Sequence, residues 1–216
     1  MATGRKKPER RGKGRPTAAA AGVGRDSLIA AARELLQELP PAQVTSTAIA
    51  KRAGADPALV RYYFGNRENL LFEVAKQIGE PANRPPPDDG DPLEVLAEMI
   101  HGTFRFTRSA KHMQRLMIEE LDSATSPEVR EKMREWNRQP IENYRRIQEL
   151  DRDGVLREFD PLFMYLATVG ISDFFATGAP LIELVVPPGT DMAELGRKYE
   201  AFVVDLITRG LLKKQG

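Results

Sequence analysis

The chain has 216 residues, of which 41% are hydrophobic and 29% are charged, a balance typical of a globular protein with a sizeable core. It contains no cysteine, which excludes a disulfide framework, a thiol nucleophile and a cysteine zinc site. The two histidines, His101 and His112, are too few to suggest histidine catalysis or a metal centre, so we expect no enzyme, no metal and no cofactor.

Positive charge is concentrated at the N-terminus. Residues 1–25 hold eight basic side chains against one acid, Glu9, although the formal net charge of the whole chain is only +1. A basic arm on an acidic body suggests contact with a polyanion through one end, and a solubilising tail is the alternative. No apolar segment follows the arm, and no run of 18 or more apolar residues occurs, so we expect a cytoplasmic protein without a membrane partner.

The first predicted helix begins at Asp26-Ser27, two side chains suited to an N-cap, and continues with apolar residues at helical spacing to Leu39. Pro40-Pro41 ends this helix, because proline lacks a backbone N–H and disfavours helix in the residue before it.

Two short helices are then predicted on either side of a glycine turn. The first starts in the hydroxyl cluster 45–47 and ends before Gly54, which suits the left-handed position after a helix. Asp56-Pro57 offers an N-cap acceptor and the favoured proline at the first helical position, so the second helix runs from there to about Phe64. Two short helices around such a turn predict a helix-turn-helix, whose second helix enters the major groove of DNA.

The order of residues in this region is more specific than its helix pattern. It reads Thr-Ser-Thr, then Ile-Ala-x-x-Ala-Gly, a short helix ending Tyr-Tyr-Phe-Gly-Asn, and a fourth helix that opens at Arg67 with Glu and Leu-Leu. Over about residues 26–74 this order resembles the DNA-binding module of the TetR family. The resemblance implies an all-α fold, in which an N-terminal three-helix helix-turn-helix domain precedes a helical ligand-binding and dimerisation domain.

The resemblance also assigns contacts with the DNA backbone. The hydroxyls of Thr45, Ser46 and Thr47, at the start of the helix that crosses the backbone, would bind a phosphate, and simple helix capping is the alternative. Tyr63 would contact phosphate through its hydroxyl, with partial burial against the first helix as the alternative. Arg67 replaces the family's usual lysine and keeps the positive charge for a phosphate.

The exposed face of the recognition helix, in the family's register, is formed by Pro57, Ala58, Arg61 and Tyr62. Arg61 stands where the family commonly has tyrosine, so the family's usual contact cannot be carried over to it. An arginine at this place can pair bidentately with a guanine, which is worth ~1–3 kcal/mol of discrimination, and a phosphate contact is the alternative. We expect this protein's own sequence preference to depend on Arg61.

A second contact with DNA is predicted in the basic arm. Gly14-Arg15-Pro16 resembles the core of AT-hook segments, which lie in narrow A·T-rich minor grooves. Arg15 would benefit there from the enhanced negative potential of the groove.

The remainder of the chain is predicted to be helical after a linker at residues 80–91 that contains four prolines. The expected helices span residues 92–109, 111–122, 127–150, 160–176 and 191–213. Pro140 should kink or split the third of them. No strand is predicted, because residues 184–186 are β-prone but too few to carry a sheet.

Aromatic and methionine side chains on these helices suit an adaptable apolar pocket, although most such side chains form plain core. By resemblance the pocket binds a small apolar ligand of unknown identity, and the residues chosen for it are Phe104, Met117, Trp136 and Phe175. TetR-like proteins dimerise through their last two long helices, and the residues chosen for a homodimer interface are Leu166, Leu195, Tyr199, Phe202, Val203 and Leu206.

The sequence therefore predicts a basic arm (1–25), a DNA-binding domain (26–74) and a helical ligand-binding and dimerisation domain (75–216). The expected function is that of a homodimeric, ligand-responsive repressor that binds a double-stranded DNA operator. Two alternatives stay open, a helical interaction or RNA-binding protein that uses the basic arm, and an all-helical enzyme. The missing cysteine, the scarce histidine and the lack of a phosphate-cradling glycine loop disfavour the enzyme.

Overall fold

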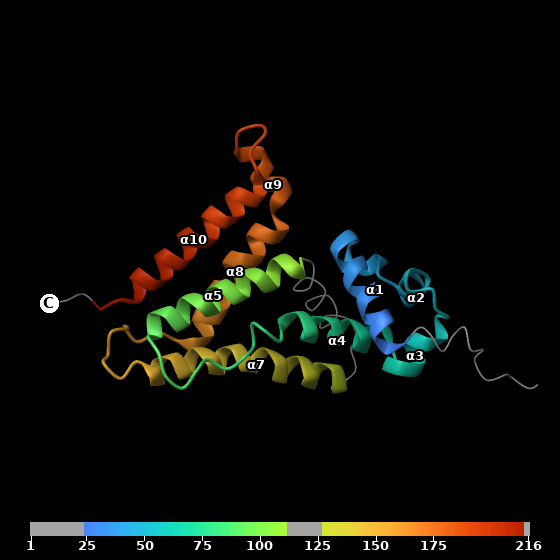
Figure 1. Ribbon diagram of the computed structural model, residues 1–216, viewed down its shortest axis with the longest axis horizontal. Coiled ribbons are helices and arrows are strands. Elements are labelled where there is room, and N and C mark those ends of the chain that lie inside the picture. Colours follow the sequence, from blue (N-terminus) through green and yellow to red (C-terminus); the bar gives the residue numbers. More distant parts are fainter. Residues whose placement is uncertain (1–23, 112–126, 214–216) are drawn as a thin grey trace, which may run out of the picture.

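The computed structural model describes residues 24–111 and 127–213, and within these ranges the chain is helical and contains no strand (Figure 1). This confirms the predicted all-α fold. The N-terminal helices are α1 (Arg25–Glu38), α2 (Ser46–Ala53), α3 (Ala58–Phe64) and α4 (Arg67–Gly79), with a 3-10 turn at Pro41–Gln43. The C-terminal helices are α5 (Pro92–Ser109), α7 (Pro127–Leu150), α8 (Pro161–Thr177), α9 (Ala179–Val185) and α10 (Met192–Leu211).

Aspartate caps set the starts of three long helices. Asp91, Asp160 and Asp191 each accept a backbone N–H in the first turn of α5, α8 and α10, at 2.8 Å. The bounds of these three helices and of α7 confirm four predicted helices, 92–109, 127–150, 160–176 and 191–213, to within two residues at each end. The predicted helix at 111–122 lies almost wholly outside the described residues.

The predicted start of the first helix is wrong by one residue. Helix α1 begins at Arg25, and the flanking residue Gly24 has no side chain to cap it. Asp26 lies inside the first turn, where its negative charge interacts favourably with the positive end of the helix dipole. Its side chain does not cap the helix. The end is as predicted, because Leu39 before Pro40 is extended.

Two features of the C-terminal helices differ from the sequence-based expectation. A short helix, α9, follows α8 directly, because Gly178 ends α8 and Pro180 is favoured in a first helical turn. The β-prone residues 184 and 185 belong to this helix. Pro140 does not split α7, which runs unbroken from Pro127 to Leu150.

The buried side chains form two clusters, and helices α5 and α7 contribute residues to both. The first joins α1, α2, α3 and α4 and is continued by Phe106 of α5 and Trp136 of α7. The second joins α5, α7, α8 and α10. Figure 1 shows α1, α2 and α3 at one end of the molecule and the long C-terminal helices at the other, with α4 between them beside α7. Helix α4, which packs on α3, is therefore also in contact with α5 and α7.

Candidate nucleic-acid interface

Helix α2 begins with a side-chain cap from the predicted hydroxyl cluster. The Thr45 hydroxyl accepts a hydrogen bond from the Ala48 N–H at 3.1 Å. Thr45 is thus the capping residue among the three, while Ser46 is half-buried and Thr47 is exposed. The Thr47 hydroxyl faces solvent at the helix N-terminus, where free amides and the helix dipole favour an anion.

The turn between α2 and α3 depends on a left-handed residue. Gly54 has φ of 66°, a conformation that a β-carbon would strain. The Asp56 carboxylate then accepts the Ala58 N–H at 2.7 Å and so caps α3, as the sequence predicted. Pro57 flanks the helix in a helical conformation, and both Pro57 and Ala58 are exposed.

Helix α3 divides into a buried face and an exposed face. Val60 and Phe64 lie in the first core cluster, which fixes the helix against α1 and α4. Arg61, Tyr62 and Tyr63 lie on the other side, and 78% of the Tyr62 surface is exposed. Among the described residues, none forms a hydrogen bond or ion pair with the Arg61 guanidinium. Five donors of one side chain are therefore available on a rigid helix.

Arg67 has a structural contact that the sequence did not indicate. Its Nε donates to the Val44 carbonyl at 2.7 Å, and its guanidinium lies 3.4 Å from the Glu68 carboxylate. These contacts tie the start of α4 to the residue before the Thr45 cap, so Arg67 holds α2 and α4 together. The phosphate contact expected of Arg67 stays a prediction. Sequence spacing could not reveal this bond, because its acceptor is a backbone carbonyl 23 residues away.

A second arginine, Arg52, joins α2 to α1 through side-chain hydrogen bonds. Arg52 of α2 donates to both carboxylate oxygens of Glu38, at 3.0 and 2.5 Å, and to Glu34 at 3.3 Å. This bidentate pairing fixes α2 against α1. Arg15 of the basic arm lies outside the described residues.

Comparison with known proteins identifies the family. A family model described as "Tetracyclin repressor-like, C-terminal domain" matches residues 92–207, which is more than half of the chain, and one described as "Bacterial regulatory proteins, tetR family" matches residues 28–74. The chain belongs to the TetR family. It is a DNA-binding transcriptional regulator, and α2 and α3 form its helix-turn-helix.

Individual relatives agree with this assignment. HTH-type transcriptional regulator BetI of Stenotrophomonas maltophilia (strain R551-3) is 32% identical over 87 residues, which are 38% of this chain and 44% of that protein. The match therefore spans less than half of that relative's length. The structure of the TetR family regulator PfmR from Thermus thermophilus shares 24% identity and a TM-score of 0.58, over 88% of this chain and 98% of that one. FadR from Bacillus subtilis, solved in complex with stearoyl-CoA, shares 21% identity and a TM-score of 0.57, over 84% and 98% of the two chains. At these identities the two structures show a common fold.

The C-terminal helices of this TetR-family regulator enclose a small cavity of about 40 Å³ next to α4. Of the four residues chosen from sequence for a ligand pocket, Trp136 lines this cavity. Phe104 lies in the second core cluster, and Phe175 stacks on Tyr199 with ring centroids 4.8 Å apart. Met117 lies outside the described residues. The structure therefore does not bring the chosen set together around one cavity.

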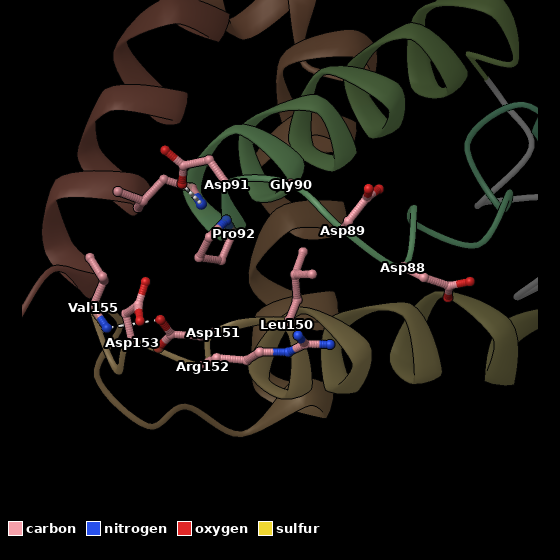
Figure 2. Close-up of a pocket in the computed structure, with 11 residues that line it drawn as sticks. Asp88, Asp89, Gly90, Asp91, Pro92, Leu150, Asp151, Arg152, Asp153 and Val155 are labelled. Atoms are coloured by element: carbon pink, nitrogen blue, oxygen red, sulfur yellow. Dashed lines mark hydrogen bonds between the residues drawn. The ribbon is translucent and has the colours of Figure 1, made fainter.

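A wider hollow of about 520 Å³ lies at the end of α5 away from α3, and its lining is acidic (Figure 2). Two of the carboxylates that line it accept hydrogen bonds from backbone N–H groups. Asp91 accepts from the Leu93 N–H, and Asp151 accepts from the Val155 and Leu156 N–H groups at 2.8 and 2.9 Å. These bonds stabilise a helix start and a turn. Within residues 24–111 and 127–213, no three His, Asp or Glu side chains are grouped as metal ligands.

The residues chosen for a dimer interface divide by exposure. Leu166, Phe202 and Leu206 are exposed. Leu195 and Tyr199 are half-buried. Val203 is 2% exposed and packs in the chain's own second core cluster, and its role in a dimer interface stays a prediction. It lies on the face of α10 that packs onto the chain's own α5.

No single helix in the described ranges is long and apolar enough to cross a membrane. Helices α8 and α9 reach that length and composition only as a pair, and the pair is bent by 73°.

Proposed function

We propose that this regulator is a homodimeric repressor, which binds a DNA operator through α3 and releases it when a small ligand occupies the C-terminal helices. The observation that carries the DNA-reading part is the exposed face of α3. Arg61 and Tyr62 project from a helix whose opposite face is locked in a core, which is the arrangement that base readout in a major groove requires.

The surface around α3 supports the same role. Thr47 on α2 and Tyr63 on α3 have exposed hydroxyl-bearing side chains, which are suited to phosphate contacts. These would fix the register of the helix on the duplex, and Arg61 would supply the sequence preference.

A homodimer is supported by the side chains of α8, because polar ones are buried within the chain and apolar ones are exposed. This helix buries Thr168 and Ser172, whose hydroxyls donate to helix carbonyls at 2.8 and 3.1 Å, while Phe163, Leu166 and Phe174 are exposed. A helix that hides hydroxyls and exposes aromatic rings is unstable alone in water, so a partner surface is expected over it. Helix α10 also exposes two large apolar side chains, Phe202 and Leu206.

Pairing two copies through α8 and α10 would form a four-helix bundle with two-fold symmetry. The two copies of α3 would then present matching reading faces to successive major grooves, about 34–36 Å apart on the duplex. A dimer is thus required by the proposed function as well as by the apolar surface.

The proposed ligand response has a physical route to α4. Trp136 lines the cavity and also packs edge-to-face on Phe72 of α4, with ring centroids 6.4 Å apart. A β-carbon on Gly79, the last residue of α4, would lie 2.6 Å from the Trp136 ring. A ligand that displaces Trp136 would therefore push directly on α4, and the resulting population shift would change the spacing of the two reading faces. A structure of the same fold, FadR, was solved with stearoyl-CoA bound, which is consistent with a small-molecule response.

Footprinting on DNA selected from a random pool tests the proposal. We expect one protected sequence, with protection lost when Arg61 or Tyr63 is changed to alanine. Arg138→Ala on α7 is the matched control, since Arg138 is an exposed arginine on a helix outside the helix-turn-helix and its loss should leave the footprint unchanged. Equal loss in all three variants, or equal retention, would contradict the proposed reading face.

A further inference from the structure

The lining of the cavity next to α4 is uncharged. Eleven of the described residues contribute to it, and none has an ionisable group charged at neutral pH; they are Ala82, Asn83, Met99, Thr103, Phe106, Trp136, Asn137, Pro140, Tyr144, Tyr165 and Val169. A carboxylate, phosphate or ammonium group buried here would lack an ion-pair partner among these residues. Burying an unpaired charge costs far more than an apolar contact returns.

Most polar groups in the lining are already paired with one another or with neighbouring groups. The Tyr165 hydroxyl donates to Asn137 at 2.6 Å, and the Tyr144 hydroxyl donates to Thr168 at 3.0 Å. Burial raises the pKa of Tyr144 to about 12, so this hydroxyl stays a neutral donor at any physiological pH.

One buried donor in the lining stands apart. The Asn83 amide nitrogen is buried and has no hydrogen-bond partner among the described residues. An unmatched buried donor costs about 1–3 kcal/mol, which a ligand acceptor at this place would recover. The cavity lining thus has one unmatched donor, while its other residues are apolar or have hydrogen-bonded polar groups.

The cavity in this structure has room for little more than a water molecule, so a larger ligand needs a wall to move. A surface groove of about 400 Å³ lies on the other side of Ala82 and Met99, which line both spaces. The unbranched Met99 side chain can change rotamer readily and so connect the groove with the cavity. Ligand entry is expected from the groove, past Met99, toward Asn83 and Trp136.

We propose that the part of the effector entering this cavity is uncharged and apolar with one hydrogen-bond acceptor, such as the carbonyl of a ketone or ester. The acceptor binds the Asn83 amide, and the apolar body packs on Trp136. This inference rests on the proposed ligand response and names the chemical class of ligand that binds at its site.

Trp136 is the only tryptophan of the chain, so its fluorescence reports directly on the cavity. Purified full-length protein is titrated with cyclohexanone and 2-octanone and, as matched charged probes, with cyclohexanecarboxylate, octanoate and octylamine. The ketones should change the Trp136 emission saturably and raise the melting temperature. The charged probes should bind at least about a hundredfold more weakly, because each must bury an unpaired charge. Charged probes that bind as tightly as the ketones, or ketones that do not bind up to their solubility limits, would overturn the proposal.

Asn83→Leu tests the acceptor requirement, with 1-octene as a probe of similar size that has no acceptor. The substitution should weaken 2-octanone binding about three- to tenfold, the usual range for one hydrogen bond, and leave 1-octene binding unchanged. Equal effects on both probes would refute the role of the Asn83 amide.

Operator binding, measured in parallel, separates the two proposals. Ketones that bind at Trp136 without changing operator affinity would refute the proposed ligand response and leave the cavity chemistry intact. An operator that responds only to charged compounds would refute the cavity chemistry and leave the ligand response intact.

Discussion

Replacing Gly79 by alanine probes the contact between the cavity wall and the DNA-binding unit. Gly79 is the buried last residue of α4, and an added β-carbon would lie 2.6 Å from Trp136 Cζ2 and 3.3 Å from the Phe106 ring. Carbon atoms in good contact are about 3.5–4.0 Å apart, so the indole or α4 must move by about 1 Å. The substitution therefore imitates the displacement that we propose for a bound ligand.

The size of the effect follows from this overlap. Overpacking of this kind costs about 1–3 kcal/mol, and the better helix preference of alanine offsets up to ~1 kcal/mol of it. If movement of α4 relieves the strain, the same free energy favours the state that does not bind DNA. Since every 1.4 kcal/mol is a factor of ten, we expect operator affinity to fall about tenfold without any ligand.

Fluorescence anisotropy on the selected operator measures this affinity, and Trp136 emission measures the local displacement. Gly210→Ala is the matched control, because a β-carbon on this helical glycine meets nothing within 4 Å. Adding Trp136→Leu to Gly79→Ala removes the clashing ring and should restore part of the lost affinity, which a double-mutant cycle quantifies. If Gly79→Ala binds operator as tightly as the wild type and its Trp136 emission is unchanged, the proposed route through α4 is refuted.

Four further predictions follow from other contacts. Phe202→Glu with Leu206→Glu should give monomers in solution scattering and weak operator binding, and retained dimers would count against the α10 interface. Thr45→Ala should lower the free energy of unfolding by about 0.5–2 kcal/mol through loss of the α2 cap, with Thr45→Ser as the control that keeps it. Burial raises the pKa of the Glu200 carboxyl, but hydrogen bonds from Arg108 and His101 outweigh it and leave the pKa below the usual 4.5. Glu200 therefore stabilises the fold above pH 4.5, and the stability advantage of the wild type over Glu200→Gln should shrink as the pH falls below that value; a constant difference in acid unfolding would show that the pairing is unimportant. Deleting residues 1–16 should weaken DNA binding and flatten its salt dependence, and an unchanged salt slope would refute a role for the arm.

The helix boundaries could be predicted from the sequence because local chemistry determines them. Asp56, Asp91 and Asp160 accept N–H groups within three residues of themselves, and Gly54 adopts the left-handed conformation expected after a helix. Such signals need no knowledge of the tertiary structure. Helix α9 was missed because residues 184–186, which overlap its end, have β-branched side chains at two of three positions. The local preference of these side chains is opposite to helix, and the helix forms after the break at Gly178 and Pro180.

The residues of the C-terminal site were much harder to predict from the sequence. When a helix has apolar residues on more than one face, the sequence does not show which face packs against the same chain. Val203 and Phe202 are neighbours on α10, yet the first is buried within the chain and the second is exposed. Likewise Phe104 faces the second core cluster while Trp136 lines the cavity. Polar residues would have been the better guide, since the buried Thr168 and Ser172 mark the inner face of α8.

The central claim, that paired α3 helices read an operator through Arg61, is tested most directly by selecting bound sequences from a random DNA pool with the wild type and with Arg61→Ala. The account predicts a two-fold symmetric site, with half-sites about one helical turn apart and one position in each half that loses its preference in the variant. A site without symmetry, or identical preferences in the two proteins, would contradict it.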